Sequence, residues 1–404
     1  MNTVLKEKVS GLSDEIKDYL EAFKDLDLLS KKDELAQLLQ ETMLKLGYDK
    51  VTVDDVGNVI GCIKGYSHRE DMVILANIDL IPNAGNQDRQ TDLIYRQTRS
   101  LTEINKVALI TSLLSGALLK RSIAALTGDL YVCCVPRFEC CGYGVQYLFD
   151  NTLQNKTIKG VLLSEPTDFD INVGNKGRME YQINIKGSST DSLLADSNLL
   201  IMNSMYPLIS RLEEARVNLP HDKELGQSNL SIKDISFSKK GEIFADNLMS
   251  VTVDRTYLAT ENSPDIINKA KAIAASVYKE PHISVSTQIN KGLTTTNKGQ
   301  DMYTPKEYKP WKMESHNSFV LNALQVLQEN SFSSQIDHWK SIVTEGSYTC
   351  GQLNLPTIGF GAGTEKDLNQ KISLPDIQRS ILGKSLIVYR SIGMPTFGWS
   401  SDDI

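Results

Sequence analysis

Two patterns of apolar positions organise the first half of this chain. Short runs of β-branched and other apolar residues alternate with segments whose apolar residues recur every three to four positions. The first pattern is typical of buried strands and the second of amphipathic helices. Strands that alternate with helices predict a mostly parallel sheet covered on both faces. The strands expected here are 51–53, 59–63, 72–75, 130–135 and 160–163, and the helices are 13–23, 30–46 and 105–119.

The pattern changes after Gly177. Apolar and polar residues alternate along 179–185, which is the period of an antiparallel strand with one exposed face. We therefore predict a small α+β domain at 178–293, inserted into a discontinuous α/β domain of residues 1–177 and 294–404. Its expected strands continue at 228–237 and 248–256, and its expected helices are 199–215 and 263–277.

The last part of the chain returns to the first pattern. The polar run 288–309 has no apolar period, so we expect a loop that leads back to the α/β domain. A helix at 315–327, a strand at 355–361 and a helix at 377–391 are expected to complete that domain.

Composition and charge exclude several classes of partner. The chain has 404 residues, 41% of them hydrophobic, and a formal charge of −7, which repels nucleic acids and anionic membrane surfaces. No stretch approaches the 18 or so uninterrupted apolar residues of a membrane span, and residues 1–8 are too charged for a signal peptide. We therefore expect a cytoplasmic protein that binds neither nucleic acid nor membrane.

Four of the six cysteines form two adjacent pairs, Cys133 with Cys134 and Cys140 with Cys141. Four thiolates are able to hold zinc, and thiol pairs are able to act in redox chemistry. However, neighbouring residues of a strand point to opposite faces, and the gap between the pairs is not that of zinc knuckles. The pattern favours structural cysteines, with a redox or metal role as the other interpretation.

The end of the strand at 72–75 is the most informative site in the sequence. Asn77 and Asp79 follow this strand two residues apart, before Pro82. Ligands of open α/β sheets bind outside the carboxyl ends of strands, so we expect a site here. Glu165 follows the strand at 160–163 in the same way.

The segment 72–82 resembles the Gly-His-x-Asp-x-x-Pro signature of the di-zinc amidohydrolases and peptidases. This family includes aminoacylase, acetylornithine deacetylase and succinyl-diaminopimelate desuccinylase, and the desuccinylase-like hydrolases are its most similar branch. The resemblance implies a zinc-aminopeptidase-like α/β domain with an inserted lid and dimerisation domain. It extends through further motifs in the same order, namely Asp55-x-Gly-Asn-Val-Ile-Gly, Glu165-Pro-Thr, Gly174-Asn-Lys-Gly-Arg, Leu219-Pro-His-Asp, Thr344-Glu-Gly and Ile358-Gly-Phe-Gly-Ala-Gly.

Most positions that hold zinc or move a proton in this family carry unsuitable residues here. Neutral imidazoles and carboxylates bind zinc, and a pair of ions lowers the pKa of a shared water, which a glutamate deprotonates. Only the glutamates survive as ligand types, and no histidine of this chain falls on a ligand position. The matched positions are Asn77 and Asn369 for histidines, Ile104 for the bridging aspartate (Glu103 or Asn105 under a shift), Phe138 for the base, Glu139 and Glu165 for ligands, Asp191 for the lid histidine, and Asp79 for the residue that orients the first histidine.

These replacements favour a catalytically silent member of the family without a cofactor, retained for binding, assembly or regulation. Lys106 or Arg137 would then neutralise the remaining carboxylates, and Arg178 or Arg255 would hold the carboxylate of a small amino-acid-like ligand, unless they form ion pairs. The resemblance implies a homodimer through the lid, or a heteromer with an active paralogue. The alternative is an active hydrolase of N-acyl or carbamoyl amino acids, with zinc or Mn²⁺ held by carboxylates.

Overall fold

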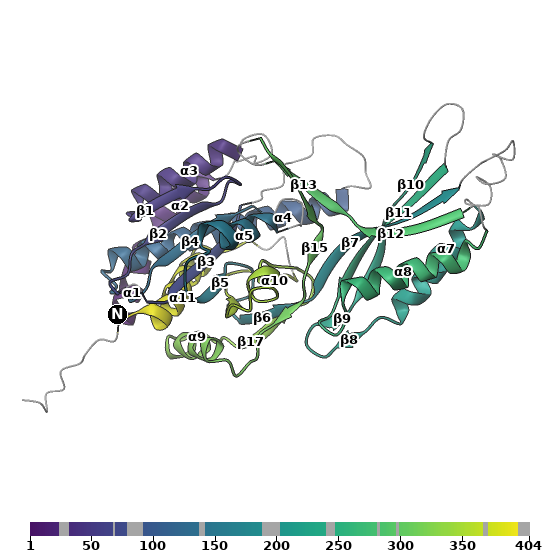
Figure 1. The fold of residues 1–404 in the computed structure, drawn as a ribbon. Coiled ribbons are helices and arrows are strands. Elements are labelled where there is room, and N and C mark those ends of the chain that lie inside the picture. Colours follow the sequence, from purple (N-terminus) through teal and green to yellow (C-terminus); the bar gives the residue numbers. More distant parts are fainter. Residues whose placement is uncertain are drawn as a thin grey trace, which may run out of the picture.

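The computed structural model describes residues 1–23, 32–67, 69–78, 92–136, 142–187, 203–239, 247–280, 283–295, 299–366 and 371–394. The described residues form two lobes, each built on its own main sheet (Figure 1). The larger lobe contains the sheet that carries the predicted site. In the part of the chain that is described, no helix is long and apolar enough to cross a bilayer.

The larger sheet has nine strands in the order β1-β2-β4-β3-β5-β18-β6-β16, with β17 beside β6. Its centre, from β4 to β18, is parallel, and antiparallel pairs lie towards both edges. The predicted mixed α/β fold is therefore confirmed. The strands are β1 (Lys50–Val53), β2 (Val59–Ile63), β3 (Asp71–Asn77), β4 (Leu130–Val135), β5 (Ile158–Leu163), β6 (Ile171–Asn175), β16 (Trp311–Lys312), β17 (Ile336–Trp339) and β18 (Thr357–Gly359).

Helices cover both faces of this sheet, which explains why every residue of β3 and β4 is buried. A larger apolar core lies on the face of the long helices α4 and α11, and a smaller one lies on the face of α5 and α10. The helices of this lobe are α1 (Asn2–Ser10), α2 (Ser13–Ala22), α3 (Lys32–Lys45), α4 (Asp92–Arg121), α5 (Tyr143–Tyr147), the π-helix η1 (Leu148–Thr152), α9 (Ser318–Glu329), α10 (Gly346–Thr349) and α11 (Leu374–Ile392).

The smaller lobe has the sheet β10-β11-β7-β12, with β15 paired to β7. The predicted alternation along β7 is confirmed, because Met179, Tyr181, Ile183 and Ile185 are at most 1% exposed and pack together on one face. Strands β10 and β11 and two helices supply the rest of this core. The elements are β7 (Gly177–Gly187), α7 (Met205–Val217), β8 (His221–Asp222), β9 (Gly226–Gln227), β10 (Asn229–Lys239), β11 (Asn247–Tyr257), α8 (Ser263–Val277), β12 (Ile283–Ile289) and β15 (Glu307–Tyr308).

The prediction of a loop at 288–309 is wrong. After β12, the chain forms an antiparallel hairpin of β13 (Lys291–Thr295) and β14 (Asp301–Pro305) before it reaches β15. Leu293 pairs with Tyr303 across this hairpin, and both are exposed, by 49% and 64%. Because neither side chain is buried, the sequence lacks the apolar period by which strands are recognised. The exact boundaries 178 and 293 of the inserted domain stay a prediction.

Candidate functional site

The carboxyl ends of β3 and β5 lie next to each other at the centre of the larger sheet. Asn77 is the last residue of β3 and is 4% exposed, and the following amide of Ile78 donates to the carbonyl of Val135 in β4 at 3.1 Å. On the other side, the amide of Ser164 donates to the carbonyl of Leu75 at 2.8 Å. The backbone ladder therefore holds the residues that follow both strands at one edge, as the sequence predicted.

Glu165 is buried at this edge, 4% exposed, against the segment that follows β18. A Cβ atom on Gly361 would lie 2.5 Å from the carbonyl oxygen of Glu165, so only glycine allows the two segments to approach this closely. The hydroxyl of Thr167 donates to the carbonyl of Gly361 at 3.2 Å and accepts from its amide at 3.0 Å. Glu165 thus has a fixed backbone position beside the C-terminal motif.

Helix α4 contributes an apolar residue to the same region. Ile104, the position matched to the bridging aspartate, is 2% exposed. Its Cδ1 would lie 3.8 Å from a Cβ atom on Gly363, which places it beside the C-terminal motif. Lys106, two residues further along α4, is 6% exposed. Under a gapless match an aliphatic side chain is therefore at the bridging position, and under a shift this position falls on Glu103 or on the buried Asn105.

Other predicted site residues lie outside the described residues. They include the proposed counter-charge Arg137 and both acidic residues expected to accompany Glu165, so the predicted group of three carboxylates stays a prediction. These positions, including the side chain of Glu103, are Asp79, Glu103, Arg137, Phe138, Glu139, Asp191 and Asn369.

Arg178 and Arg255 form ion pairs in the smaller lobe. Nε and Nη2 of Arg178 donate to Asp254 at 2.9 and 2.6 Å across β7 and β11. The side chain of Arg255 is 3% exposed, and its Nη2 donates to Glu261 at 2.5 Å. Both guanidinium groups therefore contact a carboxylate of the chain itself, which is the structural role weighed in the sequence analysis.

The structure describes one of the two adjacent cysteine pairs, and its surroundings are those of structural cysteines. Cys133 and Cys134 are free, fully buried residues of β4, and they belong to the cores on opposite faces of the sheet. Burial raises the pKa of both thiols, which disfavours the thiolate that metals and oxidants require. Cys140 and Cys141 lie outside the described residues.

One histidine of the described residues connects the two lobes. His338 of β17 is 8% exposed, and its Nε2 lies 3.6 Å from the carboxylate of Glu224 in the smaller lobe. Lys312 of β16 donates to the same carboxylate. Burial lowers the pKa of His338, although Glu224 opposes this effect. No local pattern predicts this contact, because its partners are distant along the chain.

A second residue that the sequence analysis missed is Lys384 of α11. Its side chain is fully buried, and its Nζ donates to Thr111 and Ser164, at 2.6 and 2.5 Å. Ser164 is the neighbour of Glu165. The available signal was the spacing of α11, since Lys384 lies on the same inner stripe as Ile377, Ile381 and Val388.

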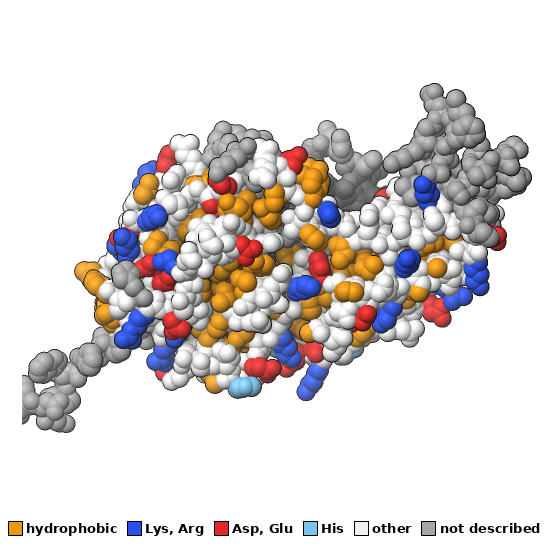
Figure 2. Space-filling view, viewed as in Figure 1, with side chains coloured by type: hydrophobic (Ala, Val, Ile, Leu, Met, Phe, Trp, Pro, Cys, Tyr) orange, Lys and Arg blue, Asp and Glu red, His pale blue; other side chains and the backbone are white. Residues whose placement is uncertain are grey.

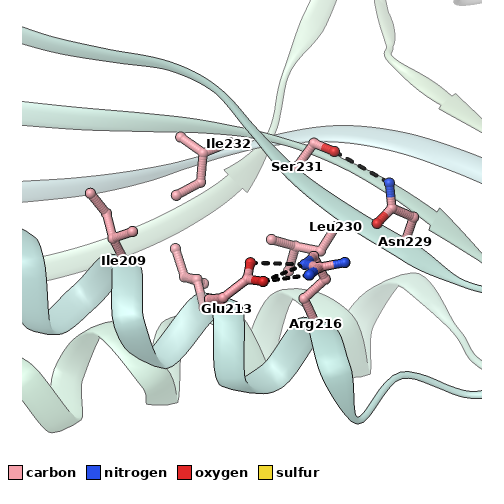
Figure 3. A pocket seen from close by; sticks show the side chains of 8 residues that line it. Ile209, Glu213, Arg216, Asn229, Leu230, Ser231 and Ile232 are labelled. Carbon is pink, nitrogen blue, oxygen red and sulfur yellow. Dashed lines mark hydrogen bonds and ion pairs between the residues drawn. The ribbon is translucent and has the colours of Figure 1, made fainter.

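Two cavities lie elsewhere. One, of about 370 Å³, lies in the smaller lobe between α7 and β10, where Glu213 and Arg216 form an ion pair (Figure 3). The other, of about 220 Å³, is enclosed by α5, α10 and the 304–309 segment and is lined by Glu307, Lys309 and Glu345 among others. Neither cavity is lined by Arg178 or Arg255.

Comparison with known proteins identifies the fold. No protein-family model matches the chain. The uncharacterized protein YgeY of Escherichia coli K12 is 27% identical over 347 residues, which cover 81% of each chain.

The structure of aminopeptidase PepT from Bacillus cereus superposes with a TM-score of 0.65 at 13% identity, covering 93% of this chain and 97% of PepT. The YXEP protein of Bacillus subtilis, described as a dinuclear metal-binding peptidase of the M20 family, gives 0.58 at 12% identity, covering 88% and 91%. The chain has the M20 peptidase fold.

The YXEP protein is described as binding a pair of metal ions. Of the positions that the resemblance matches to metal ligands, the structure describes Asn77, at a histidine position, and Ile104, at the bridging position under a gapless match, and both are buried. That this chain has a degenerate metal site stays a prediction. Glu165 alone supplies a charged oxygen ligand at the described positions. Across the described ranges, no group of three or more His, Cys, Asp or Glu side chains is placed to hold a metal ion.

Proposed function

We propose that this chain is a catalytically silent protein with the M20 peptidase fold, retained for binding, assembly or regulation. The observation that carries this proposal is the pair Asn77 and Ile104, both buried at the site and both poor replacements for metal ligands. Without two cations, the site lacks the group that makes hydroxide at neutral pH. Phe138, at the matched base position, cannot accept a proton.

Elemental analysis and an activity screen test this proposal together. The full chain is purified without chelators, its zinc and manganese content is measured, and it is incubated with N-acyl and carbamoyl amino acids and with dipeptides. We expect no stoichiometric transition metal and no turnover above a buffer blank. Two bound metal ions per chain together with turnover would overturn the proposal.

The alternative is an active hydrolase whose metal ion is held by carboxylates. Glu165 supports it, since this ligand type is kept and buried at the site. A carboxylate site favours a hard ion such as Mn²⁺. The screen is therefore repeated with added MnCl₂, on the wild type and on Glu165→Gln. Turnover that requires Mn²⁺ and disappears in Glu165→Gln would establish the alternative, and its absence in both proteins supports the silent protein.

We also propose self-association through the smaller lobe, or pairing with an active paralogue through the same surface. Strand β10 is the last strand in the order of its sheet, and Phe237 on it is 52% exposed. An edge strand offers backbone groups to a second chain. Light scattering should give a dimer for the wild type and a monomer for Phe237→Asp. The control is Leu321→Asp, which changes a 46% exposed residue of α9 in the larger lobe. A wild-type monomer that also fails to bind a coexpressed paralogue would contradict this proposal.

For the proposed amino-acid-like ligand, the cavity of about 220 Å³ is the best-suited location. Lys309 would attract the ligand carboxylate, and Glu345 would attract its ammonium group. Calorimetric titration with free amino acids tests this, with Lys309→Met expected to weaken binding and the exposed Lys159→Met expected to have no effect. Equal affinities of the two variants would contradict this location.

On the face shown in Figure 2, basic and acidic side chains are interspersed over both lobes. This distribution offers no continuous basic surface on that face, in keeping with the proposed absence of a nucleic-acid partner.

A further inference from the structure

The two lobes are joined by a narrow two-stranded connection. Strand β6 continues into β7 after one residue, and β15 continues into β16 after two. The two connections pair with each other on both sides of the junction, as β15 with β7 and as β16 with β6. A pair of strands is able to bend or twist between its paired positions, so lobes joined in this way move relative to each other unless further contacts hold them.

The β8–β9 hairpin of the smaller lobe makes a further contact between the lobes. Its turn is fixed by Asp222, whose Oδ1 accepts the amides of Glu224 and Leu225, each at 2.8 Å. Leu225 is buried, and Gly226 has a φ of +76°, which glycine adopts without strain in a tight turn. The hairpin therefore holds Glu224 at the end of the smaller lobe that faces β6 and β17 (Figure 1).

Two residues of the larger lobe meet the carboxylate of Glu224. Lys312 of β16 donates to it, and Nε2 of His338 in β17 lies 3.6 Å from it. The side chain of His338 is buried, and among the described residues its Nε2 has no hydrogen-bond partner. Buried polar atoms are normally hydrogen-bonded, so this one is an exception. The contact between the lobes therefore contains a buried ionisable ring whose outer nitrogen faces a carboxylate without bonding to it.

The surroundings of His338 decide how this contact responds to acid. Burial is the largest effect and lowers its pKa, and the ammonium group of Lys312 lowers it further. The carboxylates of Glu224 and Asp222 on the hairpin, and of Asp337 on β17, oppose this shift without reversing it. The ring is therefore neutral where it is buried, and a proton is better accommodated once the hairpin moves away and water reaches the ring. Acid favours separation of the hairpin from the larger lobe.

The same movement would change the cavity of about 220 Å³. One wall of this cavity is formed by α5 and α10 of the larger lobe, and the other by the segment 304–308 of β14 and β15. Strand β15 belongs to the sheet of the smaller lobe. The cavity therefore lies between the lobes, and its walls separate when the lobes do.

We propose that the β8–β9 hairpin is a pH-sensitive latch, in which Glu224 holds the two lobes together and protonation of His338 releases them. This inference goes beyond the proposed function, because it concerns the movement of the lobes and requires no ligand. Only its consequence for the cavity rests on the ligand location proposed above: the cavity is enclosed near neutral pH and opens in acid.

X-ray scattering of the full chain at pH 7 and pH 5 tests the latch. It is recorded on the peak eluting from a size-exclusion column, so that one oligomeric state is compared, and circular dichroism checks that the chain stays folded. We expect the radius of gyration of the wild type to be larger by about 5% at pH 5. His338→Gln should keep the smaller radius at both pH values, and Glu224→Gln should have the larger radius at both.

His316→Gln is the matched control. It removes an exposed histidine from the turn before α9, so it should follow the wild type at both pH values. An unchanged wild-type radius overturns the inference. Expansion of His338→Gln in acid, equal to that of the wild type, also overturns it, because another group would then be the one that titrates.

Glu224→Gln keeps the test decisive if His338→Gln does not fold. The side chain of Glu224 is 46% exposed, so this change should not prevent folding. A compact Glu224→Gln variant at pH 7 overturns the latch, and an expanded variant that no longer responds to acid supports it. The measurement contains neither metal nor ligand. An absent latch would therefore leave the silent function and the ligand location standing, whereas equal amino-acid affinities of Lys309→Met and Lys159→Met would refute the ligand location alone.

Discussion

Glu180 offers a quantitative test of the junction between the smaller sheet and the β13–β14 hairpin. It lies on β7 with its side chain 13% exposed, and three groups donate to its carboxylate: Lys233 at 2.6 Å, Asn290 at 2.9 Å and Lys306 at 3.2 Å. Asn290 precedes β13 and Lys306 follows β14. Burial raises the pKa of Glu180, but these hydrogen bonds and charges outweigh burial and lower it from 4.5 to about 2.

The sign and size of the effect follow from this difference. Between pH 4.5 and about pH 2, the carboxylate of Glu180 is ionised in the folded protein and protonated in the unfolded chain. The stabilisation is therefore fully present above pH 4.5 and is lost as the pH falls towards 2. At about 1.4 kcal/mol per pKa unit, the difference corresponds to about 3 kcal/mol at pH 7. The same relation leaves about 1.5 kcal/mol at pH 3. These values are upper limits, because Lys233 is partly exposed.

Urea unfolding of the wild type and Glu180→Gln at pH 7 and pH 3 measures this contribution. The variant should be less stable at pH 7 by about 1–3 kcal/mol, and the gap should shrink by about half at pH 3. Glu213→Gln is the matched control, since that carboxylate pairs with Arg216 on the exposed surface of α7 and should not change the midpoint. A gap of equal size at both pH values would show that the effect comes from packing and would refute the electrostatic explanation.

Three further predictions concern other parts of the fold. Gly346→Ala should destabilise the protein by about 1–3 kcal/mol, because the added Cβ atom would lie 2.2 Å from the ring of Trp311. Thermal unfolding measures this effect, and an unchanged melting temperature would contradict it. Wild-type stability should fall as the pH drops below about 6.5, because the unfolded chain protonates where His338 stays neutral, and His338→Gln should flatten this part of the curve. Equal slopes would show that the burial of His338 does not set the pH dependence. Arg255→Met should cost about 2–4 kcal/mol by leaving its partly buried carboxylate partner without the guanidinium, and a loss below about 1 kcal/mol in urea would refute this.

The sequence predicted the parts of the fold that bury apolar side chains. The strand at β3 and the alternation along β7 are visible in the sequence because packed faces impose a period on it. The β13–β14 hairpin was missed because Leu293 and Tyr303 are exposed, so its ladder is held by backbone hydrogen bonds that leave no period. Pairing between segments, such as β15 on β7, depends on distant residues and has no local signal.

Residues of the candidate site could be predicted from the sequence only where they belong to a recognisable motif. Asn77 and Glu165 follow strands that the sequence shows clearly, and the structure places both at the same buried edge. Lys384 belongs to no motif and is given a place only by the packing of α11 on α4 and β5. A charged residue on the inner stripe of a helix is a signal in its own right, because such a position is normally apolar.

Under the proposed silent function, the residues at the positions matched to metal ligands form a coherent set of changes in charge. A pair of divalent ions permits several carboxylates to lie close together, and removing the ions alone would leave those carboxylates repelling one another. In this chain, Asn77 and Ile104 are neutral, and Glu165 is an acidic residue at the described part of this edge. Under the proposed silent function, the loss of positive charge would thus be matched by a loss of negative charge. A site assembled in this way is able to keep its shape without metal, whereas reverting a single position, such as Ile104→Asp, would add a buried carboxylate without a partner and should destabilise the fold rather than restore metal binding.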